Sequence, residues 1–584
     1  MSRVISISNI VSKPSALARI YVWILDRLLG VAKMNRLYQQ HQMQGLSKEA
    51  FADKLIDLLE LDICGLEELK AKIPKSGPVV IASNHPFGGI EGVILARAIG
   101  QVRPDLKVLA NKGLGIFREL KDYFIFTNPL APKDPRNGPS LRQCIAHVKN
   151  GHALLIFPAG KVSFFAKEHG QISEHPWNKV LGKLISAENC AYIPVFISGQ
   201  NSPLFYRVER VFYKMRMLLL GRELLNKTGA KININAGNAI SSKHIGSGTK
   251  EFKAAYARAL SYAQDSSWRY EWPADTVVRQ KPLAQPVAAD ILKQEISLLP
   301  KEQYLTRFKG YDVYYASKHQ APMVIHEIAR LRELVFRQHN EGSGEAIDTD
   351  HFDASYTHLF IVNSATSKII GAYRMGQTDK ILAQSSVEGL YLHKMFDFKE
   401  SFLNRQTPCL EMGRSFLIPE YQGSYQGLLL LWRGIGAFVC KFPQYRTLYG
   451  TVSISKLYDP RSVRLIESLL IHESTHDVFP RERFHFKMHP EIEAFTNNHL
   501  HNLEQKSQAL SGFLAAIEHD GKDIPVLAKQ YQKMGAKFHA LGIDSSFNHT
   551  PGLLLSVELS KSPKRLLKQY LGEGYEGYLR NKGE

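Results

Sequence analysis

The stretch PVVIASNHPFGGIEGVILARAIG, residues 78–100, sets the architecture of the first half of the chain. Its opening residues, 78–83, form a short apolar run that is typical of a buried strand, and residues 92–100 have the pattern of an apolar helix. A strand that passes through a loop into a helix is the repeating unit of an α/β layer. The sequence therefore predicts an α/β domain with buried strands. Further apolar runs of this kind occur at 106–111, 152–158 and 191–198.

A histidine and a carboxylate lie on the loop between this strand and helix. Acyl transfer to an alcohol needs a base for the hydroxyl proton, and a nearby carboxylate can hold the imidazole in the correct tautomer. His85 and Glu91 supply that pair. Gly88 and Gly89 allow the backbone between them to fold back tightly, so that the two side chains can meet. The spacing predicts a general base and the acid that orients it.

Three further stretches follow along the same part of the chain, and each accompanies a predicted strand. They are NKGLGIFR at 111–118, FPAGKVS at 157–163 and IPV at 193–195. Together with the NHPFGG motif, they resemble the four sequence blocks of the glycerolipid acyltransferase superfamily over roughly residues 70–240. This resemblance implies a glycerolipid-acyltransferase-like α/β domain that transfers an acyl group to a hydroxyl.

The resemblance also implies roles for individual residues. His85 is then the general base, Glu91 is its orienting acid, and the Gly160 loop with Lys161 binds phosphate or acyl-donor groups. Arg118 fits substrate binding and a solvated helix face equally well. The substrate-binding residues implied in this half are Asn84, Gly88, Gly89, Lys112, Arg118, Pro158, Gly160, Lys161 and Ser163.

Two positions depart from the usual pattern of that superfamily. Five residues rather than four separate His85 from its acid, and the acid is Glu91 instead of an aspartate. Ala159 stands where an acidic residue usually precedes the glycine. The NHPFGG and FPAG forms resemble a branch that acylates lyso-lipids other than lysophosphatidic acid. The reaction type is therefore predicted more firmly than the substrate.

A second α/β pattern begins near residue 308, after a proline-containing stretch at 264–300 that loses periodicity. The segment 421–427, YQGSYQG, precedes a long apolar helix. A strand, a glycine-containing loop and a helix form an anion site, because N–H groups at the helix start point outward. A phosphate of a pantetheine donor suits such a site. The strand candidates of this half are 358–363, 369–376, 409–417 and 447–455.

A set of mostly charged residues of the second half carries another resemblance. In chain order they are Arg332, Phe336, Asp350, Asp353, Arg374, Glu411 and Arg414. Their order resembles that of the acyl-homoserine-lactone synthases and of their relatives, the ornithine N-acyltransferases, both of which have the GNAT fold. The likeness to the ornithine branch extends to YQKMGA at 531–536 and DSSFN at 544–548, and it covers about 310–570. It implies transfer of a 3-hydroxyacyl group from acyl carrier protein to the α-amine of ornithine.

An amine must lose a proton before it attacks a thioester, so Glu411 is the candidate base, directly or through water. The alternative is a strand carboxylate paired with Arg414 or Arg374. Asp350 and Asp353 either hold the cationic side chain of the amino acid or are solvated loop acids. The substrate-binding residues implied in this half are Arg332, Asp350, Asp353, Arg374, Arg414, Gln422, Gly423, Gln426 and Gly427.

The overall composition agrees with a peripheral membrane enzyme. The chain has 584 residues and a net charge of +19, which favours acidic partners such as acyl carrier protein or an anionic membrane surface. Five dispersed cysteines predict neither disulfides nor a metal site. Segments 16–60 and 205–222 are amphipathic or basic and apolar, and either lipid contact or packing on the domain explains them. No signal peptide and no spanning helix are expected.

The two halves together resemble the fused, bifunctional ornithine lipid synthases of bacteria. We expect an N-terminal segment at 1–60, an O-acyltransferase domain at 61–263, a linker at 264–305 and a GNAT-like domain at 306–575. The resemblance implies ornithine and lyso-ornithine lipid as substrates, acyl carrier protein or coenzyme A carrying an acyl group as donor, and no permanently bound cofactor. We expect the chain at the cytoplasmic face of the bacterial inner membrane. One alternative is a lysophospholipid acyltransferase fused to an N-acyltransferase that uses glycine or another amine, and a second is a non-catalytic scaffold that binds the membrane and acyl carrier protein. Nucleic-acid binding has only the net charge in its favour.

Overall fold

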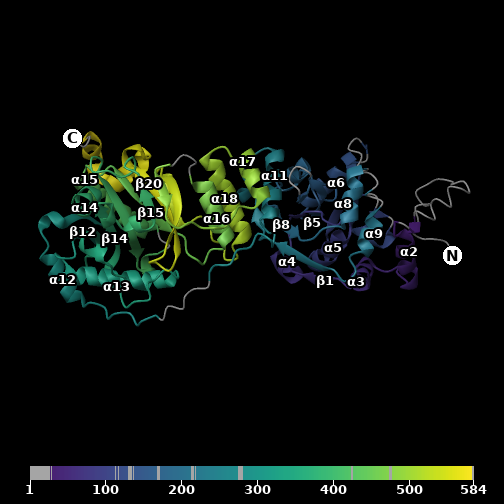
Figure 1. Ribbon diagram of the computed structural model, residues 1–584, viewed down its shortest axis with the longest axis horizontal. Coiled ribbons are helices and arrows are strands. Elements are labelled where there is room, and N and C mark those ends of the chain that lie inside the picture. Colours follow the sequence, from purple (N-terminus) through teal and green to yellow (C-terminus); the bar gives the residue numbers. More distant parts are fainter. Residues whose placement is uncertain are drawn as a thin grey trace, which may run out of the picture. The chain divides into compact units, whose positions relative to one another are not determined.

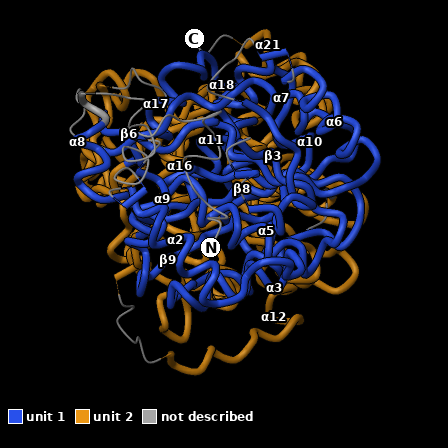
Figure 2. The backbone as a smooth tube through the Cα atoms, turned by 90° about the vertical axis from the view of Figure 1, so that its right-hand side faces the viewer, with its two compact units in different colours: residues 1–269, 488–521 blue, residues 270–487, 522–584 orange. Residues whose placement is uncertain are grey.

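The computed structural model describes residues 26–581 except 28, 112–113, 116, 129–133, 136, 167–170, 212–215, 217–218, 274–279, 423–424 and 472–475. Its contacts divide the chain into two compact units, shown in separate colours in Figure 2. Unit 1 comprises Met1–Arg269 and Met488–Gly521, and unit 2 comprises Tyr270–Lys487 and Lys522–Glu584. Each unit contains an eight-stranded sheet with helices, so the α/β class predicted for both halves is confirmed.

The sheet of unit 1 is built around β2 (Val79–Ser83), in which every residue is buried. Strand β2 pairs in parallel with β8 (Ala191–Ile197) on one side and with β5 (Ala153–Ile156) on the other. Because such strands are covered on both faces, they appear in the sequence as continuous apolar runs. The order is β1-β9-β8-β2-β5-β3-β4, with β10 beside β8. The remaining strands are β1 (Asp62–Cys64), β3 (Lys107–Asn111), β4 (Phe124–Thr127), β9 (Lys231–Ala236) and β10 (Ile240–Ser241).

Helices cover both faces of this sheet. Val79 and Ile81 of β2 pack in one core with α5 (Ile90–Val102). Side chains alternate along a strand, so the register partners Val80 and Tyr192 face the other side, where the Tyr192 hydroxyl donates to a carbonyl of α11 (Lys250–Tyr262). The other helices of the first 269 residues are α2 (Val31–Gln40), α3 (Lys48–Leu58), α4 (Leu66–Lys72), α6 (Asn137–Lys149), α7 (Lys179–Leu184), α8 (Pro203–Val211), α9 (Leu220–Leu225) and α10 (Ser242–Ile245).

Two helices from the second half of the chain complete unit 1. We predicted that 306–575 would form one domain, but α17 (Pro490–His499) and α18 (Leu503–Ile517) pack against α11 (Figure 1). The Tyr256 ring stacks on Phe495 with centroids 5.4 Å apart, and the Tyr256 hydroxyl donates to the carbonyl of Ala509 at 2.6 Å. The apolar faces of both helices are thereby buried on unit 1, which explains why they leave the fold that surrounds them in sequence.

The sheet of unit 2 has the order β11-β12-β13-β14-β16-β17-β20-β19. Its central pair, β16 (Cys409–Leu417) and β17 (Thr447–Ser453), is parallel, and the neighbouring pairs are antiparallel. The remaining strands are β11 (Tyr304–Phe308), β12 (Tyr311–Ala316), β13 (Thr357–Asn363), β14 (Ile369–Gln377), β19 (Lys537–Asp544) and β20 (Thr550–Glu558).

The parallel strands of unit 2 separate before they end. Pairing of β16 with β17 stops at Met412 and Gly450, whereas β16 continues along β14 to Leu417 and β17 continues along β20 to Ser453. The register between β14 and β16 also shifts by one residue near Arg414, whose φ is +51°. A bulge of this kind bends a strand. An opening therefore forms between the carboxyl ends of β16 and β17.

Helices lie on both faces of this sheet as well. α13 (Pro322–Gln338) packs with Phe360 of β13, whereas Gly434 of α15 (Tyr425–Lys441) approaches Leu359 of β13. Adjacent residues of a strand face opposite sides, so α13 and α15 cover opposite faces. The other helices of unit 2 are α12 (Ala289–Ser297), α14 (Thr378–Ser385), α16 (Pro460–Leu470), α19 (Val526–Lys533), α20 (Lys564–Leu571) and α21 (Tyr575–Arg580), and α12 lies inside the predicted linker 264–305.

The two predicted membrane segments lie partly outside the described residues. Residues 16–25 and 28 are among those not described, while α2 and α3 bury Tyr38 and Phe51 in the core of unit 1. In 205–222, Arg216 is fully buried and donates to the carbonyls of Val162 and Ser163. Arg207 is exposed, and the side chains of residues 209–215 are not described. Within the described ranges, no helix has the length and apolar character needed to cross a bilayer.

Candidate functional sites

His85 and Glu91 meet in unit 1, at the carboxyl end of β2. The Nδ1 atom of His85 lies 2.9 Å from Oε1 of Glu91, which is fully buried, and the His85 side chain is 18% exposed. Because Nδ1 faces the carboxylate, Nε2 lies on the opposite edge of the ring, and it has no hydrogen-bond partner among the described residues. An imidazole oriented in this way can take a proton at Nε2.

The Glu91 carboxylate also organises the loop that carries His85. Its Oε1 accepts the backbone N–H groups of Phe87 at 2.9 Å and Gly88 at 2.8 Å, and its Oε2 accepts that of Gly89 at 2.8 Å. Gly88 has a φ of +96°, and a β-carbon there would lie 2.7 Å from side-chain atoms of Val162 and Leu220. Glycine is therefore required at position 88 for both backbone conformation and space.

The charges of the pair are strongly coupled. Burial alone would raise the pKa of Glu91, but the charge of His85 and the backbone N–H groups outweigh it and lower the pKa to about 2. Burial lowers the pKa of His85, but the Glu91 charge outweighs it, so the net effect is a raised pKa. Glu91 is therefore ionised at neutral pH, and its charge favours the protonated form of the His85 imidazole.

Other predicted residues of this half hold the loop in place. The Asn84 side chain donates to the carbonyl of Ile197 at 2.8 Å and accepts its N–H at 2.7 Å, which ties β2 to β8. The Ser163 backbone N–H donates to the carbonyl of His85 at 3.1 Å, and its hydroxyl donates to the carbonyl of Pro86 at 3.3 Å. Both residues therefore contact the backbone around His85.

The predicted loop after β5 lies beside the histidine. The rings of Phe157 and His85 have centroids 4.8 Å apart, and Gly160 has a φ of +63°. The loop that contains Pro158, Gly160 and Lys161 is therefore connected to the His85 loop. Phe157 makes one contact with it, and Ser163 makes the other. Arg118 begins the helix η3 (Arg118–Tyr123) and is exposed. Lys112 lies outside the described residues.

Glu174, which we did not predict, adjoins His85. Its carboxylate accepts the backbone N–H of His85 and, at 2.9 Å, the indole N–H of Trp177. Burial raises the pKa of Glu174. Arg258 of α11 donates to the Glu174 carbonyl at 3.2 Å and to the Glu491 carboxylate of α17 at 2.8 Å. No motif identifies Glu174, because two of its partners, His85 and Arg258, lie far from it in the sequence.

The predicted arginines and aspartates of the second half form one buried network in unit 2. Arg332 of α13 donates to both oxygens of Asp353, each at 3.1 Å, and its Nε lies 3.0 Å from Asp348. Arg374 of β14 donates to Asp350 at 2.6 Å and to Asp353 at 3.1 Å. The two arginines hold the pKa of Asp353 far below its usual range, although burial acts in the opposite direction. Asp350 and Asp353 are thus paired with protein cations, and they are not solvated loop acids.

Arg414 joins this network from the bulge of β16. Its Nε lies 3.5 Å from Asp348, and its guanidinium donates to the Tyr391 hydroxyl at 3.0 Å. The Tyr391 hydroxyl in turn donates to Asp544 at 2.7 Å. The guanidinium also lies 4.3 Å from the centre of the Phe547 ring. The DSSFN motif at 544–548 therefore contributes two contacts beside the strand opening.

Glu411 is buried on the part of β16 that still pairs with β17. Its Oε1 accepts the Tyr356 hydroxyl at 2.7 Å and the Leu392 N–H at 3.3 Å, and its Oε2 accepts the Tyr449 hydroxyl at 2.9 Å. Burial raises its pKa, although these hydrogen bonds and the charge of Arg374 oppose the rise. Its hydrogen bonds go to two tyrosines and a backbone N–H, and none is formed with Arg414 or Arg374.

The predicted anion loop precedes α15. The Gln422 side-chain amide donates to the carbonyl of Leu417 at 2.8 Å. Gln426 is exposed and Gly427 is buried in the first turn of the helix, whereas Gly423 lies outside the described residues. Gln422 and Gln426 lie between β16 and α15 or in the first turn of α15, and the binding of a phosphate there stays a prediction.

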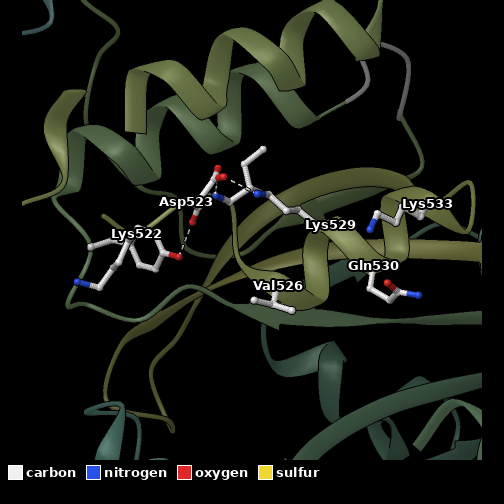
Figure 3. A pocket seen from close by; sticks show the side chains of 8 residues that line it. Lys522, Asp523, Val526, Lys529, Gln530 and Lys533 are labelled. Atoms are coloured by element: carbon white, nitrogen blue, oxygen red, sulfur yellow. Dashed lines mark hydrogen bonds and ion pairs between the residues drawn. The ribbon is translucent and has the colours of Figure 1, made fainter. Parts of the chain in front are cut away.

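Unit 2 also contains a basic cavity of about 380 Å³ near the residues that follow β17 (Figure 3). Figure 3 shows the Lys529 side chain directed to Asp523, its ion-pair partner. The Tyr458 hydroxyl donates to the Asp523 carbonyl at 2.7 Å. The cavity is lined by Tyr458, Lys522, Asp523, Ile524, Val526, Lys529, Gln530 and Lys533.

Models of two protein families match one part each of the chain. The model of a family described as acyltransferase matches residues 62–266, and that of a family described as acetyltransferase (GNAT) domain matches residues 331–433. A solved CoA-dependent acyl-homoserine lactone synthase aligns with 44% of this chain and 95% of its own, at 9% identity and a TM-score of 0.23. A score this low gives no support for a common fold.

Relatives of two kinds are similar to the chain. It is 26% identical to the glycine N(alpha)-acyltransferase of Bacteroides thetaiotaomicron over 49% of this chain and 88% of that protein. It is 27% identical to the lyso-glycine lipid O-acyltransferase of the same species, over 36% of this chain and 80% of that protein. The glycine N(alpha)-acyltransferase of Phocaeicola vulgatus is 32% identical over 30% of this chain, and the match spans 56% of that protein.

Proposed function

We propose that this chain, an acyltransferase with an acyltransferase domain and a GNAT domain, performs two successive steps of amino-acid lipid synthesis. Unit 2 transfers a 3-hydroxyacyl group to the α-amine of an amino acid. Unit 1 then acylates the free 3-hydroxyl of the product. The contact of 2.9 Å between His85 and Glu91 is the observation that carries the second step.

The proposed chemistry of unit 1 is general base catalysis on a thioester. Nε2 of His85 takes the proton of the lyso-lipid hydroxyl while the hydroxyl oxygen attacks the acyl carbon. Glu91 keeps the imidazole oriented and stabilises its protonated form. The proton then passes to the sulfur of the departing thiol. The lyso-lipid already carries the first acyl chain, so the product has two.

The proposed amino acid is ornithine, which the resemblance of 310–570 implies. Glycine is the second candidate, because the relatives of this chain include glycine N(alpha)-acyltransferases. Asp350 and Asp353 already pair with Arg374 and Arg332, so a cationic ornithine side chain has to find its partner elsewhere in unit 2. Direct competition between the two amino acids will therefore decide between the candidates.

The proposed donor is acyl carrier protein, with coenzyme A as the alternative, and the proposed location is the cytoplasmic face of the bacterial inner membrane. The net charge of +19 supports both, because the carrier protein and inner-leaflet lipids are acidic. The lysines around the cavity of unit 2 add positive charge near the residues that follow β17.

The function is tested by supplying the purified chain with a 3-hydroxyacyl carrier protein, a second acyl donor and labelled ornithine or glycine. We expect a mono-acylated species that is converted into a di-acylated one. The wild-type chain should use ornithine in preference to glycine, and the opposite preference would favour the second candidate. A chain that labels neither amino acid would refute the proposed N-acyl step, and a product that stays mono-acylated would refute the O-acyl step.

The pH dependence of the O-acyl rate should report the effect of Glu91 on the pKa of His85. Protonated His85 cannot accept a proton, so kcat/KM should fall as the pH decreases through the raised pKa of His85, which lies above 6.5. Glu91→Gln removes the charge that raises this pKa, so the midpoint of its residual activity should lie at lower pH. An unchanged midpoint in Glu91→Gln would show that the two groups do not interact during catalysis.

A further inference from the structure

Glu341 is a buried carboxylate of unit 2 that neither resemblance includes. It follows the end of α13 and is 6% exposed. Its Oε2 accepts the Ser453 hydroxyl at 3.0 Å. No cation within 4 Å pairs with it among the described residues, and its Oε1 has no hydrogen-bond donor there. The aspartates of the neighbouring network, by contrast, are neutralised by arginines.

The position of Glu341 coincides with the opening between β16 and β17. Ser453 is the last residue of β17, beyond the point where the two strands separate, and Arg414 lies beyond the same point on β16. The charge of Arg414 acts on the Glu341 carboxyl. Glu341 is therefore linked to both separating strands, by a hydrogen bond to one and by electrostatics to the other.

The turn that carries Glu341 is fixed by contacts with other elements. The Ser455 hydroxyl donates to the carbonyl of His339 at 2.8 Å, and the Asn548 side chain donates to the carbonyl of Asn340 at 2.8 Å. The backbone N–H of Glu341 donates to the carbonyl of Phe336 at 2.9 Å. The carboxylate is thus held on an ordered turn, which is what a group that must meet a reacting atom requires.

We propose that Glu341 accepts the proton of the α-ammonium group of the amino acid. This inference rests on the N-acyl activity proposed for unit 2. The Glu341 carboxylate takes one proton, and the free amine attacks the carbonyl carbon of the thioester. The C–N bond forms and the C–S bond breaks, and a second amine proton goes to the sulfur of the departing thiol. Glu341 afterwards returns its proton to solvent.

The environment of Glu341 suits this role better than that of Glu411. Both oxygens of Glu411 accept hydrogen bonds, whereas one oxygen of Glu341 has no donor. Burial raises the pKa of Glu341 to about 7, although the Ser453 hydroxyl and the Arg414 charge oppose it. A base is most effective when its pKa lies near the working pH. The other nearby charges, Arg337 and Glu333 of α13 beside Gly342, form an ion pair at 2.7 Å.

The test measures N-acylation by the full chain between pH 6 and pH 10, with a 3-hydroxyacyl carrier protein and either ornithine or glycine. Glu341→Gln should lower kcat at pH 7 by about 100-fold or more. It should also remove the decline of activity below about pH 7, and activity should recover at high pH as free amine accumulates. The O-acyl activity of the same chain on added lyso-lipid is the control for folding.

Two further variants separate a base from a structural carboxylate. Ser453→Ala removes a hydrogen bond that lowers the pKa of Glu341. The fall of N-acylation activity at low pH should therefore begin at a higher pH in this variant. Glu411→Gln should lower N-acylation activity at every pH, and the activity should still fall below about pH 7 as in the wild type.

The inference is wrong if Glu341→Gln keeps wild-type kcat at pH 7. It is also wrong if the fall of activity at low pH persists in Glu341→Gln and disappears in Glu411→Gln. In the latter case Glu411 is the base. If the fall of activity occurs at the same pH in Ser453→Ala as in the wild type, Glu341 is not the base. A wild-type chain that acylates no amine would instead refute the proposed function of unit 2.

Discussion

His85→Ala should stop O-acyl transfer and leave N-acyl transfer intact, so that the mono-acylated lyso-lipid accumulates in cells that express the chain. Loss of a positioned general base costs about 10²- to 10⁴-fold in rate. His85 is the imidazole that Glu91 orients at 2.9 Å, and its Nε2 has no other partner within the described part of the chain. The measurement is the ratio of mono-acylated to di-acylated lipid in extracts, together with kcat on purified lyso-lipid.

His152→Ala is the matched control for this variant. His152 is 44% exposed and pairs with Asp105 at 3.0 Å, so its loss should cost little. Normal di-acylated lipid from His85→Ala would show that another group is the base. A loss of both lipid species would show instead that His85→Ala disturbs more than unit 1.

A fragment that ends at residue 305 should fail to fold into an active O-acyltransferase, although it contains the whole sequence that resembles one. It lacks α17 and α18, which bury their apolar faces on α11. Each buried apolar side chain contributes about 1.5–3 kcal/mol. Several such contributions are a large share of the roughly 5–15 kcal/mol that stabilises a typical protein. The side chains of α17 and α18 that are buried in this way include Ile492, Phe495, Leu510, Phe513, Leu514 and Ile517.

The fragment also loses a direct connection to the catalytic loop. Glu491 of α17 holds Arg258, which donates to the carbonyl of Glu174, and the Glu174 carboxylate accepts the backbone N–H of His85. Without Glu491, Arg258 is partly unpaired next to the site. We therefore expect the fragment to lack both a cooperative thermal transition and O-acyl activity.

The outcome is checked by adding residues 488–521 to the fragment through a flexible linker. Restored activity would confirm that these helices complete unit 1. A fragment 1–305 that folds and acylates lyso-lipid without them would refute this role. In the full chain, Glu491→Gln should keep the fold and lower the O-acyl rate, because only the link from Arg258 to Glu491 is weakened.

The sequence by itself determined the class of each fold and much of each site. Short apolar runs predicted β2, β3, β5 and β8, because strands covered on both faces require apolar side chains throughout. The pairing of His85 with Glu91 was predictable, since the loop between them is short and contains the glycines that it needs. The resemblance in residue order singled out Arg332, Asp350, Asp353, Arg374 and Arg414, but it did not predict that these residues pair with one another.

Only the tertiary structure decided which residues complete these sites. The Glu174 carboxylate accepts the backbone N–H of the distant residue His85, and Glu341 reaches Ser453 across more than a hundred residues of chain. The helices α17 and α18 belong to unit 1 although the sequence places them inside the second half. Local spacing encodes strands, loops and caps, because these depend on neighbouring residues. Long-range packing depends on which apolar faces and buried charges find partners, and a single sequence does not specify those partners in any local pattern.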